Sequence, residues 1–478
     1  MVIIMKNKSI WINDNKKVSS DKKILEDVHT DILIIGGGIT GLTTAYFLKD
    51  SKKKITLIDK SIIGMGVTSK TTAKISYLQG ITYQTLEKNF NNRVAKLYLD
   101  SQLDAITLIR NIVQDNKISC DFEEADSIIF TTEESGISKI EYEKELIKKC
   151  GIDVKDVSHD RIKRGIKVSG TYVFNPMKYI DSLRKILESK ISIYENVLAN
   201  EILTSNGMYE VKTNCGSIFT KEVVIACHYP FFLVLLFIPL KTYIKREYVS
   251  AAKVDNSSNY TALSIDKTLH SVRFYKDYLI YGSNKHRLTS KIDYKENYDK
   301  SREDFKKYFG AIPEYTWMNQ DIVSNDELPF IGEIKDKMYL ATAYNAWGMT
   351  NGTIAGKIIS DSIQNNFNKY TSLFDPKRGN LSLYINSFLG VFHYGKVYAQ
   401  SLWKKNIPNY VTIKNVLYGV YVDDNGEKHI IKLICPHMKC NLIFNKEEKT
   451  WDCPCHGSRF DLDGNVIEGP ATKSVDKK

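Results

Sequence analysis

The stretch DILIIGGGITGLTTAYFL (residues 31–48) predicts a strand, a tight turn and a helix in direct succession. A short β-branched apolar run precedes three glycines, and apolar residues at helical spacing follow them. Gly36, Gly38 and Gly41 form G-x-G-x-x-G, whose glycines permit the tight turn, the approach of backbone to pyrophosphate and close helix–strand packing. Because the free amides of the helix N-terminus then face the phosphates, the stretch predicts a dinucleotide site.

An acidic residue stands where such a site requires one. A second predicted strand, residues 54–58, ends at Asp59, which lies about twenty residues beyond the glycines. A carboxylate there accepts hydrogen bonds from the ribose and disfavours a 2′-phosphate. These residues alone leave FAD and NAD open.

Three further segments resemble the FAD-dependent amine and D-amino-acid oxidase superfamily. Residues 64–76 (GMGVTSKTTAKIS) are similar to its flavin-facing segment, residues 223–227 to the strand that closes its FAD domain, and residues 326–352 to its C-terminal flavin-binding stretch. The resemblance covers residues 28 to about 365 and implies FAD as a cofactor; Ala343 departs from the glycine common in the family. Besides the three glycines and Asp59, it implies flavin or nucleotide contacts by Lys60, Thr71, Thr72, Ala73, Lys74, Trp347, Gly348, Met349 and Thr350.

A helix is predicted from about Gly352 to Ile363, directly after the turn at residues 347–350. Its N-terminal amides are expected to face the pyrimidine edge of the flavin and stabilise negative charge on the reduced ring. The sequence has no second G-x-G-x-x-G after a strand, so we expect an organic substrate, and not NAD(P)H, to reduce the flavin.

The C-terminal region contains a second set of redox residues. ICPHMKC (residues 434–440) and CPCHGSRF (residues 453–460) supply C-x-H, fifteen intervening residues and C-x-x-H. This pattern suits a Rieske [2Fe-2S] centre, with Cys435 and Cys453 on one iron and His437 and His456 on the other. A Cys2His2 zinc site needs the same ligand types, but zinc fingers pair them as C-x-x-C and H-x3-5-H.

Residues 400–478 resemble Rieske domains of the high-potential kind. That resemblance implies a disulfide between Cys440 and Cys455, and a hydrogen bond from Ser458 to a cluster sulfur. Phe460 stands where the highest-potential members have a tyrosine. Since hydrogen-bond donors stabilise the reduced cluster, the missing hydroxyl is expected to lower the potential somewhat.

Composition sets the broad class. The chain has 478 residues, 43% of them hydrophobic and 26% charged, which predicts about three globular domains and excludes a disordered or fibrous protein. The excess of 67 Lys and Arg over 56 Asp and Glu, a formal charge of +11, favours anionic neighbours. Lys6 and Lys8 interrupt the only apolar run of residues 1–17, so no secretory signal is predicted and we expect a cytoplasmic protein.

The predicted fold class is an α/β, Rossmann-like FAD-binding domain with an α+β, antiparallel-sheet substrate domain and a small all-β Rieske domain. The predicted boundaries are 28–82, 165–227 and 320–370 for the FAD domain, 83–164 and 228–319 for the substrate domain, 371–404 for a linker and 405–478 for the Rieske domain.

The combination predicts an FAD-dependent oxidoreductase that oxidises an amine or amino-acid-like substrate. Hydride passes to the flavin, and electrons leave singly through the cluster to an external acceptor, which is a protein, a quinone or oxygen. Candidate substrate-binding or acid–base residues are Arg246 and Arg273, as carboxylate clamps, and His228 and His286. No nucleic-acid partner is expected.

Two other functions remain open. One is an electron carrier or redox sensor without turnover. The other is a membrane-associated quinone reductase, for which residues 231–238 (FFLVLLFI), followed by Lys241, Lys245 and Arg246, would contact the membrane surface. Membrane association is not favoured, because His228, Pro230 and Pro239 divide the apolar stretch at residues 223–240.

Overall fold

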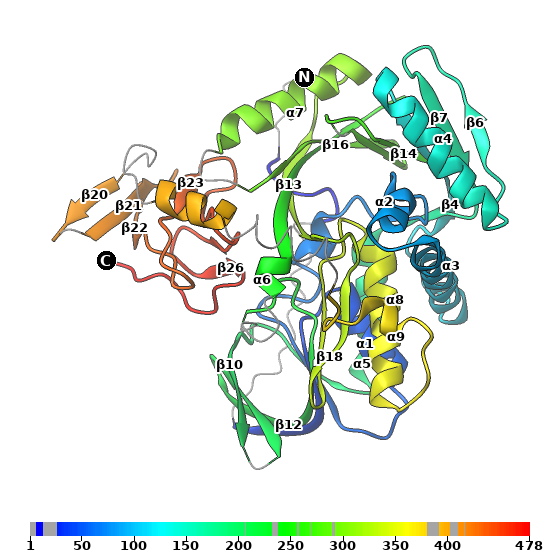
Figure 1. Ribbon diagram of the computed structural model, residues 1–478. Helices are drawn as coiled ribbons and strands as arrows, with labels where there is room; N and C mark the ends of the chain where they lie inside the picture. Colours follow the sequence, from blue (N-terminus) through cyan, green and yellow to red (C-terminus); the bar gives the residue numbers. More distant parts are fainter. Residues whose placement is uncertain are drawn as a thin grey trace.

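The glycine-rich turn joins β1 (Val28–Ile35) to α1 (Ile39–Leu48) in the computed structural model (Figure 1). The structure describes residues 6–12, 26–205, 207–231, 238–255, 258–268, 270–288, 292–379, 392–401, 410–414 and 416–478. β1 lies in parallel between β2 (Ile55–Ile58) and β12 (Gly216–Ile225), and its inner residues are buried, as expected for a central parallel strand.

An eight-stranded sheet surrounds this strand, in the order β10-β11-β12-β1-β2-β9, with β19 also pairing with β12 and β18 pairing with β19. The remaining strands are β9 (Ser192–Tyr194), β10 (Ala199–Ser205), β11 (Met208–Thr213), β18 (Phe330–Lys335) and β19 (Met338–Thr342). Helix α1 contacts both α5 (Pro176–Glu188) and α8 (Gly348–Ile363). Helix α8 begins at Gly348, earlier than predicted, so its first turn includes residues predicted to precede it.

The second large sheet is mostly antiparallel and has the order β17-β13-β16-β15-β14-β5-β7-β6. Its strands are β5 (Asp126–Thr131), β6 (Lys155–Val157), β7 (Arg164–Val168), β13 (Thr242–Lys253), β14 (Tyr260–Ser264), β15 (Ser271–Tyr275), β16 (Tyr278–Arg287) and β17 (Tyr315–Ser324). The sheet therefore runs a few residues past the predicted domain boundaries at 164 and 319, because β7 and β17 complete hydrogen-bonded ladders within it.

Helices complete this second domain. α3 (Asn92–Asp115) follows α2 (Thr82–Asn89), and Asn91 caps α3 by accepting a hydrogen bond from Val94 N. The others are α4 (Glu134–Lys149), α7 (Tyr294–Phe309) and the single turn α6 (Ile238–Lys241). Three short strands from separate parts of the chain form a small third sheet. They are β3 (Lys74–Ile75), β8 (Tyr172–Val173) and β4 (Glu123–Glu124).

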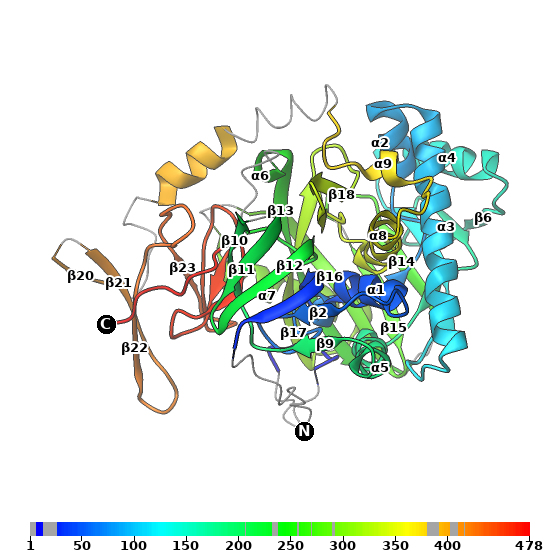
Figure 2. The same cartoon turned by 90° about the horizontal axis from the view of Figure 1, so that it is seen from below.

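The described strands of the C-terminal domain form two small sheets, and the domain packs against the second large sheet, at the left of Figure 1. One sheet contains β20 (Tyr410–Ile413), β21 (Val416–Val422) and β22 (Lys428–Lys432), and the other β23 (Ile443–Asn445), β24 (Thr450–Asp452), β25 (Arg459–Phe460) and β26 (Val466–Glu468). Trp451 is fully buried in its core, and Val397 joins that core from a helical segment at residues 392–401, which lies within the predicted linker (Figure 2).

The chain between the domains is tied to the first of them. After α9 (Thr371–Phe374), the Arg378 guanidinium donates to both carboxylate oxygens of buried Asp326, at 2.9 and 3.0 Å. This bidentate pair holds the start of the predicted linker on the FAD-domain side.

None of the described helices combines the length and apolarity needed to cross a membrane. Of the proposed membrane-contacting segment, residues 232–237 lie outside the described part of the chain, so that hypothesis is not tested by the fold.

Helix α8 lies against α1 through glycines. A Cβ at Gly356 would stand 2.5 Å from Thr43 Oγ1 and 2.8 Å from Thr44 N, whereas a Cβ at Gly395, in the helical segment 392–401, would meet nothing within 4 Å. We therefore expect Gly356→Ala to lower the free energy of unfolding by about 2 kcal/mol through overpacking. Gly395→Ala should be neutral or stabilising by up to about 1 kcal/mol. Urea denaturation of both variants measures this, and equal stabilities would contradict the packing argument.

Candidate functional site

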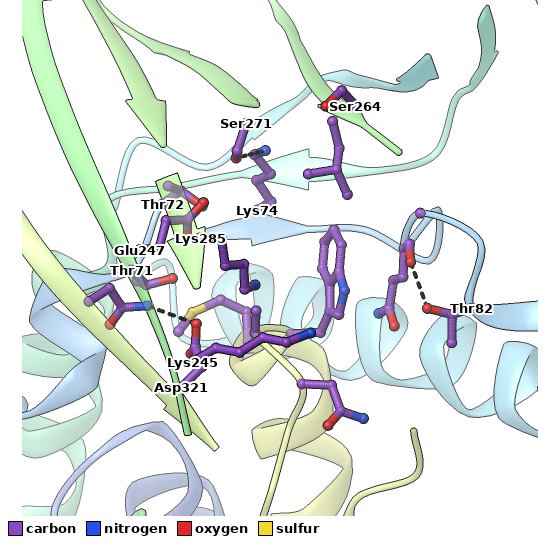
Figure 3. Close-up of a pocket in the computed structure, with 18 of the residues that line it drawn as sticks. Thr71, Thr72, Lys74, Thr82, Lys245, Glu247, Ser264, Ser271, Lys285 and Asp321 are labelled. Atoms are coloured by element: carbon purple, nitrogen blue, oxygen red, sulfur yellow. Dashed lines mark hydrogen bonds between the residues drawn. The ribbon is translucent and has the colours of Figure 1, made fainter. Parts of the chain in front are cut away.

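Two cavities meet beside the glycine-rich turn. The dinucleotide cavity, of about 420 Å³, begins at Gly36 and Gly38 and passes Asp59 and Lys60. The polar cavity, of about 320 Å³, lies between the second sheet and the flavin-facing segment (Figure 3). Both are lined by Lys70, Thr71, Asn319, Asp321, Ala346 and Met349. The two cavities are therefore neighbouring parts of one site.

Two of the glycines stand where the backbone leaves no room for a side chain. Gly36 adopts φ +112°, and a Cβ on it would lie 2.5 Å from the Ala226 carbonyl oxygen. A Cβ at Gly41 would lie 1.8 Å from the Gly36 carbonyl oxygen, so only glycine allows α1 to approach the turn. Gly38 has no side chain to cap α1, Thr68 Oγ1 accepts a hydrogen bond from Ile39 N at 3.3 Å, and this end of the helix lines the dinucleotide cavity. The arrangement suits a pyrophosphate.

Asp59 is held at the end of β2 by backbone donors. Its carboxylate accepts from Gly37 N at 2.7 Å and from Ser61 N at 2.8 Å, and burial raises its pKa. Lys60, beside it, also lines the cavity, and burial lowers its pKa. These contacts position an acceptor at the place predicted for the ribose.

The flavin-facing segment is fixed by its carbonyl groups. Trp317 Nε1 donates to the Lys70 carbonyl at 2.8 Å, and Trp11 Nε1 donates to that of Thr71 at 2.7 Å. Arg273 donates to the carbonyls of Thr72 and Ala73, and Ala73 has a left-handed φ of 53°. Since successive carbonyls are bound, the backbone of residues 70–73 has one defined path along both cavities.

The polar cavity contains charges of both signs. Its lining includes the cationic side chains Lys74, Lys245 and Lys285 and the acidic side chains Glu247 and Asp321 (Figure 3). Lys74 Nζ donates to Ser271 Oγ and to the Ala262 carbonyl. Burial lowers the pKa of Lys74 to about 7 and raises that of the Glu247 carboxyl. An ammonium and a carboxylate can both find partners here, and Lys74 can exchange a proton near neutral pH.

Most of the other residues predicted to contact FAD line one of the two cavities. Gly348 lines the dinucleotide cavity, and Thr72, Lys74 and Trp347 line the polar cavity. Thr350 is fully buried, and its hydroxyl lies 3.4 Å from Gln79 Nε2. Ala343 adopts φ 62°, a left-handed conformation that glycine would adopt without strain, so the local backbone keeps the glycine-type path despite the substitution.

The structure does not bring the predicted acid–base and clamp residues to the polar cavity. Arg246 is fully buried and binds Asp452, and Arg273 binds backbone carbonyls, including that of Phe174 at 2.7 Å. His286 stacks on Tyr248, and His228 lines the dinucleotide cavity with its Nε2 3.1 Å from the Gln320 carbonyl oxygen. Burial lowers the pKa of both histidines. Within the described residues, no arginine lines either cavity.

Strands β13 and β17 form a wall between the polar cavity and the C-terminal domain. They pair with Arg246 opposite Gln320. Side chains alternate across a strand, so Glu247 and Asp321 face the polar cavity, while Arg246 and Gln320 face the C-terminal domain. The polar cavity and the C-terminal domain are therefore separated here by the thickness of one sheet.

Buried ion pairs join the wall of β13 and β17 to the C-terminal domain. Arg246 Nη1 donates to Asp452 Oδ2 at 2.9 Å, and both side chains are at most 1% exposed. Asp452 also accepts from Arg459 Nε at 3.2 Å, and Arg459 forms an ion pair with Glu448. Burial alone would raise the carboxyl pKa values, but Arg459 and Arg246 lower that of Asp452, and Arg459 and Lys70 lower that of Glu448 to about 2.

The cysteines and histidines of the C-terminal domain converge at one end of it. The Cys435 and Cys453 thiols are hydrogen-bond partners, and the hydrogen bond from Cys453 lowers the pKa of Cys435 to about 7. The His437 and His456 rings lie 5.1 Å apart, and their Nδ1 atoms are buried with no partner in the described structure. A disulfide joins Cys440 to Cys455, the bridge that the resemblance implied. Two free thiols and two unpartnered ring nitrogens fit a [2Fe-2S] cluster.

A dinucleotide domain, a substrate-type sheet and an all-β domain with two Cys and two His define a flavin oxidoreductase fused to an iron–sulfur module. Comparison with known families agrees: residues 31–362 match the model of the FAD dependent oxidoreductase family, DAO, and residues 394–477 match the Rieske [2Fe-2S] domain. The chain belongs to the DAO family and carries a C-terminal Rieske domain. Its cofactors are FAD and a [2Fe-2S] cluster, and the predicted fold class is confirmed.

A similar protein carries a Rieske name, and similar solved structures agree with the fold of the first two domains. The putative Rieske 2Fe-2S iron-sulfur protein YhfW of Bacillus subtilis (strain 168) is 30% identical over 479 residues, which cover 94% of this chain and 93% of that protein. Among solved structures, glycine oxidase from Geobacillus kaustophilus has a TM-score of 0.62 at 13% identity and covers 74% of this chain and 99% of its own. L-proline dehydrogenase from P. horikoshii has a TM-score of 0.60 at 18% identity, covering 74% and 98%.

Sequence reasoning missed two groups of lining residues. The first group is the polar side chains of β13 and β17 that line the polar cavity, such as Glu247 and Asp321. The alternation of side chains along a strand shows that Arg246 and Glu247 face opposite sides, but it does not show which of the two faces the cavity. The segment 466–472 of the Rieske domain lines the dinucleotide cavity, although it follows the glycine-rich turn by more than 400 residues. No local pattern marks such a contact.

The buried ion pair between Arg246 and Asp452 gives a prediction about stability. Arg246→Met leaves the buried Asp452 carboxylate without one of its cations and should lower the free energy of unfolding by about 3 kcal/mol. Arg302, whose guanidinium pairs with Glu447 at 3.0 Å and is 17% exposed, provides the matched control. Arg302→Met should cost less than about 1 kcal/mol. Urea denaturation followed by tryptophan fluorescence compares them, and equal losses would show that burial does not set the energy of these pairs.

Proposed function

We propose that the protein oxidises an amine or amino-acid-like substrate in the polar cavity and passes the electrons singly through the Rieske domain to an external acceptor. The observation that supports this most is the wall of β13 and β17, which has the polar cavity on one side and the Rieske domain on the other. FAD supplies two-electron hydride acceptance, and the cluster supplies one-electron transfer. Oxidation of the C–N bond to an imine releases one hydride and the amine's proton.

The charges of the polar cavity favour a substrate that has both an ammonium and a carboxylate. We assign Lys245 and Lys285 to the carboxylate, because they are the cations on β13 and β16 that line the cavity and no described arginine does so. Glu247 and Asp321 lie on the same wall and suit the ammonium. The named activities of the similar structures, glycine oxidase and L-proline dehydrogenase, agree with this class of substrate.

We assign Cys435, His437, Cys453 and His456 as the cluster ligands. His456 is covered by Tyr394, whose ring stacks on it at 4.8 Å and whose hydroxyl donates to the Thr242 carbonyl at 3.0 Å. His437 is only partly buried, and Met438 beside it is 56% exposed. We therefore place the exit of electrons to the acceptor on the His437 side. A cytoplasmic location remains our prediction.

The routing is tested by anaerobic stopped-flow reduction with a panel of amines and amino acids. In the native protein the substrate should bleach the flavin, and the electron paramagnetic resonance signal of a reduced histidine-ligated cluster should follow. Cys453→Ser removes a proposed cluster ligand, so it should keep flavin reduction within about a factor of two and lose the signal. If every substrate leaves both centres of the native protein oxidised, a non-turnover electron carrier becomes the better description.

A pH profile tests the role of Lys74. Its amine is neutral above a pKa of about 7, and only then can it accept the proton of the substrate ammonium. The rate of flavin reduction should therefore rise with pH through about 7 and then level. Lys74→Met should slow it about 100-fold and remove this inflection. Lys245→Met, the control, should raise KM and keep the inflection; an unchanged profile in Lys74→Met would refute the assignment.

A further inference from the structure

One wall of the dinucleotide cavity belongs to the Rieske domain. The lining residues from that domain are Val466, Ile467, Glu468, Gly469, Ala471 and Thr472. They share the cavity with Asp59, Lys60 and His228, at the end where the first domain presents its proposed ribose acceptor. A site for a cofactor of the first domain is thus incomplete without residues far along the chain.

Contacts across this end of the cavity are close and polar. Glu468 accepts a hydrogen bond from Gln320 Nε2 at 3.1 Å, and its carboxylate lies 3.9 Å from His228 Nε2. Its side chain is 14% exposed. A Cβ at Gly469 would stand 3.8 Å from the Tyr229 carbonyl oxygen, so the backbones of the two domains approach each other there. The segment is therefore held at more than one point, by Gln320 on β17 of the second sheet and by His228 and Tyr229, which follow β12 of the first.

The opposite side of the same segment is bound to the region of the proposed cluster ligands. Ala471 N donates to Ser458 Oγ at 3.0 Å, and the Ser458 hydroxyl in turn contacts the Cys435 thiol. β26, which contains the first residues of the segment, pairs with β25. A displacement of residues 466–472 therefore cannot occur without disturbing the strand and the serine beside the ligand thiols.

We propose that the Rieske domain completes the FAD site, with residues 466–472 covering the adenosine half of the cofactor. The consequence is a thermodynamic coupling: a docked Rieske domain tightens FAD binding, and bound FAD stabilises the docked domain by the same factor. This coupling holds the two redox centres in one arrangement whenever FAD is bound. It depends on the cofactor and not on which substrate is oxidised.

FAD titration of the full-length apoflavoprotein tests the first half of the proposal. Thr472→Trp places an indole at the cavity wall and should raise the Kd for FAD at least about tenfold, and Ile467→Ala removes apolar cover and should raise it about fivefold. The matched controls are Lys473→Trp, which adds the same bulk at the exposed next residue, and Val422→Ala, which truncates an apolar side chain that is 49% exposed and does not line the cavity. Both controls should bind FAD as the native protein does. Native-like affinity in Thr472→Trp and Ile467→Ala alike would overturn the proposal.

Hydrogen–deuterium exchange tests the second half without any turnover. FAD added to apoflavoprotein that retains its cluster should slow amide exchange in residues 466–472 and in the loop 453–460, and should do so less in Thr472→Trp at equal FAD concentration. Exchange in both segments that is unaffected by saturating FAD would overturn the coupling. The result is independent of the proposed substrate, because an inactive protein with this coupling would still show the protection.

Discussion

The alternation of side chains on β13 and β17 is the constraint on which the arrangement of the protein depends. One residue of each pair along these strands lines the polar cavity, and the next reaches the Rieske domain. Because the period of a strand is two, a shift by a single residue would move Glu247 away from the cavity and Arg246 into it. The register that places Arg246 opposite Gln320 therefore determines both which side chains line the polar cavity and where the Rieske domain docks.

Buried charges make the docking position of the Rieske domain on β13 and β17 specific. Arg246, Asp452 and Arg459 are at most 1% exposed, and desolvation of such groups offsets much of their mutual attraction. Their main effect is that misplacement is costly, since any other position of the Rieske domain leaves a buried charge without a partner. Lys70 links this cluster to the cofactor site, because its side chain lines both cavities and its charge lowers the pKa of Glu448.

Local patterns predicted a dinucleotide site and an iron–sulfur cluster, and the resemblance of residues 28 to about 365 to a known family implied that the dinucleotide is FAD. The glycines of residues 36–41 and the paired Cys and His residues of the Rieske domain lie within short segments, where steric or ligand requirements restrict which residue types can stand. Arg273 shows where such reasoning stops. Its type suits a carboxylate clamp, but its guanidinium instead binds the carbonyls of Thr72 and Ala73 and shapes the flavin-facing turn. A guanidinium serves either purpose, and only its neighbours in space decide between them.

The amino-acid sequence alone determined a dinucleotide site, the Cys and His ligand types of the second site and the order of the two sites, because each site rests on spacing within a few tens of residues. Tertiary structure alone decided which face of β13 lines the polar cavity, that Lys245 and Lys285 and no described arginine line it, and that residues 466–472 line the dinucleotide cavity. These features depend on contacts between segments hundreds of residues apart, and sheet register and domain docking, which no local pattern encodes, bring those segments together.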